Sequence, residues 1–254
     1  MLGYTTVGNG AEKVLVFHGW FGDYSVWEPT FKAMDTERFT YAFIDYRGYG
    51  KSAEQSGEYT MREIAADALE VVRALGWDEL HVVGHSMGGM AMQRFILDCG
   101  ADITVKSAVG VTPVPACGGQ LDDDSWTLFS GAVSEDGNRY GILDFTTGQR
   151  LGAAWLKQMV AASRAQTNEA AYRGYLHAWA RENFADEIGG ITTPMLVCVG
   201  EHDAAINADA MRATYLEWYD NCELEIIANA GHYPMQETPV WLMTLLEGFM
   251  SQHA

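Results

Sequence analysis

The sequence predicts an α/β fold built on a mostly parallel sheet, because short strand-like segments alternate with helical ones. The strand-like segments are apolar and rich in β-branched and aromatic residues, as is typical of buried strands. Strands that alternate with helices favour a parallel sheet covered on both faces. The strands are expected over residues 13–19, 39–45, 80–85, 104–111, 194–200 and 223–228.

Helical periodicity fills most of the intervals between these strands. Residues 61–75 place Ile64, Ala68, Val71, Val72 and Leu75 near one face. Similar spacing predicts helices over 87–97, 208–218 and 239–249.

Residues 116–188 interrupt the alternation, since they are rich in glycine, aspartate and aromatic residues. Within them, TNEAAYRGYLHAWARENF predicts a helix. We expect a core formed by residues 1–115 and 189–254, and a helical cap formed by 116–188. A cap over the carboxyl ends of the strands would form a lid on a pocket.

The charge balance argues against polyanionic partners. The 254 residues include 16 Lys and Arg against 34 Asp and Glu, a formal net charge of -18. This disfavours nucleic acid and anionic membrane surfaces as partners. No apolar run approaches the roughly 18 residues of a spanning helix, so we expect no membrane insertion.

Neither cysteine nor histidine spacing predicts a metal site. Cys99, Cys117, Cys198 and Cys222 form no Cys-x-x-Cys pair, and the histidines lack zinc-site spacing. The first residues lack a basic segment followed by an apolar one, so we expect a cytoplasmic protein with free thiols. The sequence makes no prediction of oligomeric state.

The segment GHSMG places Ser86 between Gly84 and Gly88, where a strand passes into a helix. A sharp turn there would present the hydroxyl clear of the sheet, and small residues must flank it because the turn brings them together. The following helix directs its amides at an anion formed on the serine. The pattern predicts a nucleophile.

A serine nucleophile needs a base, and the base needs an acid that orients it. Asp203 follows one apolar strand and His232 follows the last, so both can converge with Ser86 at one sheet edge. Asp45 is an alternative candidate for the acid, but its glycine-rich DYRGYG segment favours a structural loop. The segment TPVPACGG, after the strand ending near Val111, offers no carboxylate.

Five ordered motifs carry a resemblance to the α/β-hydrolase superfamily: FHGW, DYRGYGKS, GHSMGG, GEHD and GHYPMQETP. The combination of HGW with GHSMGG is similar to the serine-dependent bacterial arylesterases, perhydrolases and cofactor-free haloperoxidases. Only GYTTVG precedes the VLVFHG strand, so we expect the sheet to lack a first strand.

The resemblance implies a serine hydrolase of carboxylic esters that needs no metal or organic cofactor, with a small-molecule ester as its substrate. It also implies an oxyanion hole formed by the backbone N–H groups of Trp20 and Met87. Lactonase, perhydrolase-like and carbon–carbon bond hydrolase activities would use the same triad. A small-molecule receptor of this fold, with little turnover, is the alternative outside the enzymes.

Cap residues provide the candidates for substrate binding. Aromatic side chains in this region could line an apolar pocket or form the core of the cap. The candidates are Trp126, Phe129, Trp155, Trp179 and His177.

Overall fold

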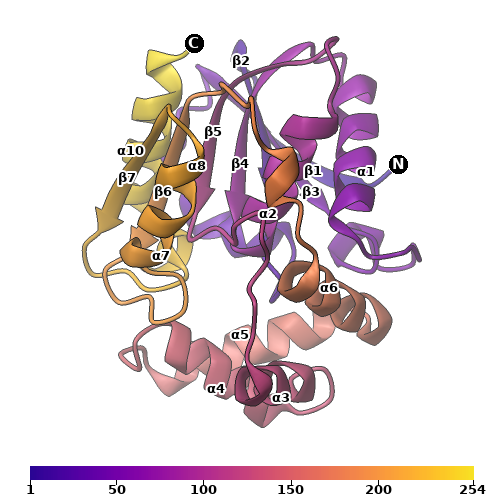
Figure 1. Ribbon diagram of the computed structural model, residues 1–254, viewed down its shortest axis with the longest axis vertical. Coiled ribbons are helices and arrows are strands. Elements are labelled where there is room, and N and C mark those ends of the chain that lie inside the picture. The colour runs from indigo at the N-terminus through magenta and orange to yellow at the C-terminus, as the bar shows by residue number, and fades with distance from the viewer.

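The computed structural model describes residues 1–254, and a seven-stranded sheet with the order β1-β3-β2-β4-β5-β6-β7 forms its centre (Figure 1). All neighbouring strands from β3 to β7 in this order are parallel. The predicted α/β fold is therefore confirmed. The parallel strands are β2 (Glu12–Phe17), β3 (Phe39–Asp45), β4 (Glu79–His85), β5 (Thr104–Val111), β6 (Met195–Gly200) and β7 (Cys222–Ile227).

The segment GYTTVG differs from its prediction, since it forms the edge strand β1 (Gly3–Gly8). It pairs antiparallel with β3, and Gly3 lies opposite Asp45. This pairing needs little side-chain burial, because the main chain of β3 supplies the hydrogen bonds. The strand is consequently hard to recognise from hydrophobicity.

Helices flank the sheet. Helix α1 (Met61–Ala74) packs against α2 (Met87–Asp98), and the 3-10 helix η1 (Tyr24–Ala33) packs against α10 (Pro239–Gln252). The helix predicted over 208–218 is interrupted at Thr214, which separates α7 (Ala208–Ala213) from α8 (Tyr215–Trp218). The remaining short helices outside the cap are η2 (Gly50–Ser52) and α9 (Pro234–Glu237).

Four α-helices lie between β5 and β6 in the chain, and we refer to them as the cap helices. They are α3 (Asp123–Gly131), α4 (Asp136–Thr146), α5 (Ala153–Gln166) and α6 (Glu169–Arg181), followed by the 3-10 helix η3 (Ala185–Glu187). Figure 1 shows them gathered beyond one end of the sheet. They are therefore placed to cover the carboxyl ends of the central strands.

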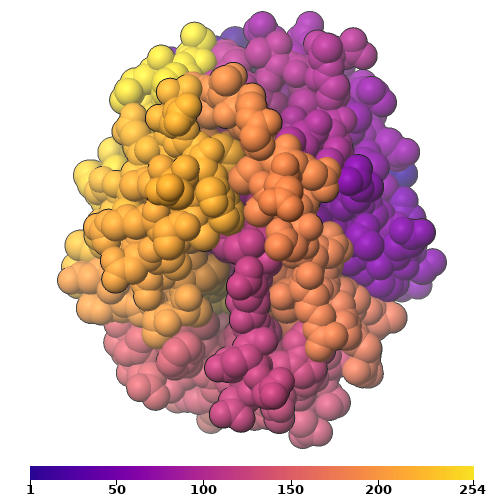
Figure 2. Space-filling view, viewed as in Figure 1, coloured from indigo at the N-terminus to yellow at the C-terminus, as the bar shows by residue number.

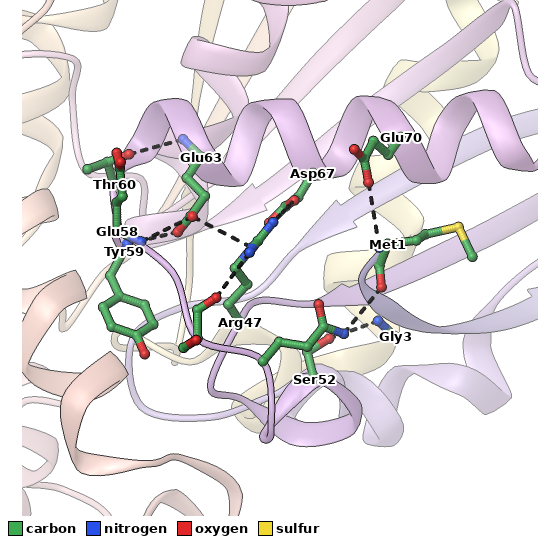
Figure 3. Close-up of polar contacts among 12 residues, drawn as sticks. Met1, Gly3, Arg47, Ser52, Glu58, Tyr59, Thr60, Glu63, Asp67 and Glu70 are labelled. Atoms are coloured by element: carbon green, nitrogen blue, oxygen red, sulfur yellow. Dashed lines mark hydrogen bonds and ion pairs between the residues drawn. The ribbon is translucent and has the colours of Figure 1, made fainter.

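The loop after β3 is tied to α1 by a polar network (Figure 3). Arg47 donates to both carboxylate oxygens of Asp67, at 2.7 and 2.8 Å. At the start of α1, Thr60 accepts from the N–H of Glu63, and the Glu63 carboxylate accepts from the N–H groups of Glu58 and Tyr59. These capping bonds and the bidentate ion pair fix the loop that carries Tyr46 and Tyr49.

None of the helices combines the length and the hydropathy that crossing a membrane requires. All four cysteines are free thiols.

Candidate active site

Ser86 lies between β4 and α2 with φ 53° and ψ -120°, a conformation that is unfavourable for a residue with a Cβ. The glycines on either side permit this turn. A Cβ on Gly84 would lie 2.4 Å from the carbonyl oxygen of Gly88, and one on Gly88 would lie 2.5 Å from that of Phe17. The turn is closed by backbone contact, which explains the need for glycine at both positions.

Ser86, His232 and Asp203 form a continuous hydrogen-bonded chain. The Nε2 atom of His232 lies 3.0 Å from the Ser86 Oγ, and its Nδ1 atom lies 2.7 Å from an Asp203 Oδ. The other carboxylate oxygen of Asp203 accepts from the N–H groups of Ala205 and Ile206, both at 2.9 Å. These two backbone donors hold the carboxylate in the orientation that the imidazole requires.

The sheet brings these three residues together because each follows a different parallel strand. Ser86 follows β4, Asp203 follows β6 and His232 follows β7, and the carboxyl ends of these strands share one edge. The cap also contributes, since the N–H of His232 donates to the carbonyl of Thr146 at the end of α4. The loop after β7 that carries His232, referred to as the histidine loop, is thus held by both the sheet and the cap.

Two backbone N–H groups beside Ser86, those of Trp20 and Met87, donate to no acceptor within the protein. Met87 is the first residue of α2. The loop that carries Trp20 approaches the serine closely, since a Cβ on Gly19 would lie 3.3 Å from the Ser86 Cβ. Both N–H groups therefore have the free hydrogen-bonding capacity that an oxyanion hole requires.

The buried His18 shapes the loop that carries Trp20. Burial lowers the pKa of His18 to about 4, so its imidazole is neutral near pH 7. One consistent arrangement has Nδ1–H donating to the Gly19 carbonyl at 2.8 Å and Nε2 accepting from the Tyr46 N–H at 3.3 Å. The hydroxyls of Tyr46 and Tyr49 donate to the carbonyls of His18 and Trp20.

Sequence reasoning did not identify these two tyrosines as part of the site. Both lie in the DYRGYG segment, whose glycines predict only a shaped loop. The feature of the sequence that could have indicated their role is the presence of two tyrosines in a glycine-rich loop directly after a strand.

A cavity of about 410 Å³ opens beside Ser86 and His232, between the cap helices and the loops at the strand ends. Figure 2 shows the hollow between the segments near residues 115–125 and 200–215. The lining contains no Asp, Glu, Lys or Arg. Its hydrophobic side chains include Trp20, Phe21, Leu121, Phe129, Ile142, Phe145, Ile206, Met211 and Trp179.

Two of the five predicted substrate-binding residues, Phe129 and Trp179, line this cavity. Trp126, Trp155 and His177 are not among the residues that line it. Trp126 packs against His177 and lies under the guanidinium of Arg181, 3.6 Å from its ring centroid. The indole N–H of Trp155 points to Gln236 Oε1, at 3.4 Å. These side chains stabilise the outer part of the cap and its contact with the histidine loop.

Several cavity residues had no recognisable signal in the sequence. Phe21 follows β2, Ile142 and Phe145 lie on α4, and Ile206 follows β6. These three segments meet at the cavity only when the cap docks on the sheet.

Comparison with known proteins gives the same fold. A model of the Alpha/beta hydrolase family matches residues 14–244. The chain is 29% identical over 252 residues to the pimeloyl-[acyl-carrier protein] methyl ester esterase of Vibrio cholerae, covering 94% of each chain. It is 26% identical over 249 residues to the non-heme haloperoxidase of Rhodococcus erythropolis, covering 90% of this chain and 88% of that one.

Among solved structures, an esterase from Exiguobacterium antarcticum superposes with a TM-score of 0.85 at 19% identity, covering 98% of this chain and 94% of the other. The family match spans the region from the first parallel strand to the last helix. The chain is therefore a member of the alpha/beta hydrolase family.

Proposed function

We propose that this protein is a serine hydrolase that cleaves carboxylic esters. The observation that carries the proposal is the chain of hydrogen bonds from Asp203 through His232 to Ser86, which ends at an apolar cavity. Ser86 supplies the nucleophile, His232 the general base and Asp203 the orienting carboxylate. Residues 116–188 act in this proposal as the cap that selects the substrate.

In the first half-reaction, Ser86 Oγ bonds to the ester carbonyl carbon while its proton passes to His232 Nε2. The N–H groups of Trp20 and Met87 donate hydrogen bonds to the carbonyl oxygen and stabilise the negative charge that develops on it. One donor of this kind contributes about 3 kcal/mol to transition-state stabilisation. The carbon–oxygen bond to the alcohol then breaks, and the proton on His232 passes to the departing alkoxide.

In the second half-reaction, His232 removes a proton from water, and the resulting hydroxide attacks the acyl carbon. The bond to Ser86 Oγ breaks, the serine recovers its proton from His232, and the carboxylic acid leaves. Asp203 stabilises the imidazolium during both steps through the bond to Nδ1.

The cavity favours uncharged and predominantly apolar substrates. A carboxylate or ammonium group in this space would lose water without meeting an opposite charge from the lining. The net charge of -18 further disfavours anionic esters at a distance. The methyl ester esterase of Vibrio cholerae, a relative along nearly the whole chain, supports the assignment of ester hydrolysis.

The test is hydrolysis of p-nitrophenyl esters, from acetate to long acyl chains, by the wild type, Ser86→Ala and Ser125→Ala. Ser125 is a matched control, because it also lines the cavity but lies outside the triad. We expect turnover that is abolished only in Ser86→Ala. Activity that survives in Ser86→Ala would disprove the assignment of the nucleophile.

If the wild type hydrolyses none of these esters, the esterase assignment is wrong. Lactones and vinylogous diketones would then test the lactonase and carbon–carbon hydrolase alternatives. A ligand that raises the melting temperature without being turned over would instead indicate a receptor.

A further inference from the structure

The cap contains a buried cation that lacks an acidic hydrogen-bond partner. Arg139, on α4, is 1% exposed. Its Nε donates to the carbonyl of Ala132 at 2.8 Å, and one of its Nη atoms donates to the Ser163 hydroxyl at 2.7 Å. Both acceptors are neutral, so the guanidinium needs another favourable contact to offset its loss of hydration.

That contact is the aromatic ring of Tyr172, on α6. The guanidinium carbon of Arg139 lies 3.9 Å from the centroid of the Tyr172 ring. The ring of Trp20 lies 4.0 Å from the same centroid, at an interplanar angle of 16°. Two groups this close to one ring must occupy its opposite faces, so Arg139, Tyr172 and Trp20 form a three-layer stack.

A hydrogen bond reinforces the connection between this stack and the site. The indole N–H of Trp20 donates to the backbone carbonyl of Tyr172 at 2.7 Å. On the other side of the loop, the Tyr49 hydroxyl donates to the carbonyl of Trp20 at 3.0 Å. Trp20 is therefore clamped between the loop after β3 and the cap helix α6, and its side chain is 4% exposed.

We propose that Arg139 and Tyr172 are positioning residues that hold the backbone N–H of Trp20 in the geometry of the oxyanion hole. This inference depends on the proposed ester hydrolysis, in which that N–H stabilises the transition state. The cap thus contributes to the chemical step as well as to substrate selection. An oxyanion donor that moves by a fraction of an ångström loses much of its effect, while substrate binding in the apolar cavity is retained.

The following variants distinguish an effect of the three-layer stack on the reaction from an effect of the general stability of the cap. Arg139→Met removes the cation, and Arg139→Lys retains it. Arg164→Met is the matched control, because Arg164 also donates to a cap carbonyl, that of Val133, and pairs with Asp136. Tyr172→Phe retains the ring and removes a buried hydroxyl that has no partner, whereas Tyr172→Leu removes the ring.

The kinetic readouts are kcat, KM and the affinity for an arylboronic acid, which forms a tetrahedral anion on the serine. We expect Arg139→Met and Tyr172→Leu to lower kcat and boronic acid affinity about tenfold, with KM within about twofold of wild type. Arg139→Lys should recover part of both losses. Tyr172→Phe and Arg164→Met should remain within about twofold of wild type.

The proposal is overturned if folded Arg139→Met and Tyr172→Leu retain wild-type kcat and boronic acid affinity. It is also overturned if Arg164→Met, at equal melting temperature, loses as much as Arg139→Met. Should Arg139→Met fail to fold, the comparison of Tyr172→Phe with Tyr172→Leu provides the same test.

Hydrogen exchange at the Trp20 N–H separates this proposal from the assignment of ester hydrolysis. Without the stack we expect faster exchange at Trp20 and unchanged exchange at Met87. A wild type that hydrolyses no ester would disprove the proposed function alone. Unchanged Trp20 exchange in Arg139→Met and in Tyr172→Leu would disprove the positioning role alone.

Discussion

The Nε2 atom of His85 lies 2.9 Å from the backbone carbonyl oxygen of His232. His85 is buried, and this burial lowers its pKa well below the ordinary value, so the imidazole is neutral. Its Nε2–H therefore donates to the His232 carbonyl, which also accepts from the hydroxyl of Thr112 at 3.2 Å. The residue beside the proposed nucleophile thus holds the main chain of the residue proposed as base.

Replacing His85 should slow the reaction without weakening substrate binding. His85→Phe removes the donor while keeping the shape of the ring, which leaves only Thr112 on the His232 carbonyl. We expect kcat to fall on the order of tenfold, with KM within about twofold, because the imidazole of His232 loses part of its orientation. A fall in kcat equal to that of Ser86→Ala would instead identify His85 as a participant in the chemistry.

The strained backbone at Ser86 predicts that glycine at this position is more stable than alanine. Glycine tolerates φ 53° without a steric cost, whereas alanine does not. We expect Ser86→Gly to be about 1 kcal/mol more stable than Ser86→Ala, although both lack the hydroxyl. Urea unfolding with equal m-values measures the difference. Equal stability of the two variants would show that the backbone at Ser86 is not strained.

Buried neutral histidines predict a loss of stability in acid. Burial lowers the pKa of His81 to about 4, against an ordinary value of 6.5; Lys106 and His253 also lower it, and Glu12 opposes the shift. Because the folded pKa is below the unfolded one, the contribution to stability is present above pH 6.5 and is lost as the pH falls through 4. The loss is about 3 kcal/mol.

The test compares unfolding free energies between pH 7 and pH 4 in His81→Gln and the wild type. The variant should show a shallower decline, because it no longer takes up this proton on unfolding. The exposed His177 provides the control, and His177→Gln should leave the dependence of the unfolding free energy on pH unchanged. If the unfolding free energy of His81→Gln depended on pH as strongly as that of the wild type, the predicted contribution of His81 would be wrong.

Cavity size should control the acyl-chain profile. Phe129→Ala enlarges the space beside the site, so kcat/KM for long or bulky acyl groups should rise several-fold relative to acetate. Each additional methylene that becomes buried contributes about 0.8 kcal/mol. Trp126→Ala removes a similarly large aromatic group from the same helix but outside the cavity, and its profile should match the wild type. A shifted profile in Trp126→Ala would place the acyl subsite elsewhere.

The predicted fold and the geometry proposed for the triad follow from local features of the sequence. Apolar strand segments, glycines at 84 and 88, and residues placed directly after strands are short-range patterns, and parallel strands then bring Ser86, Asp203 and His232 to one edge. The positions of these residues therefore depend on topology that the alternation of strands and helices already implies.

Only the tertiary structure determined which side chains surround Ser86, Asp203 and His232. Trp126 and Phe129 are three residues apart on α3, yet only Phe129 reaches the cavity, because the docking of the cap helices determines which residues of α3 line it. Arg139 has the sequence context of an exposed helix residue, and only the assembly of the cap helices buries it on Tyr172. Such contacts join residues far apart in the chain, so periodicity within a single helix does not reveal them.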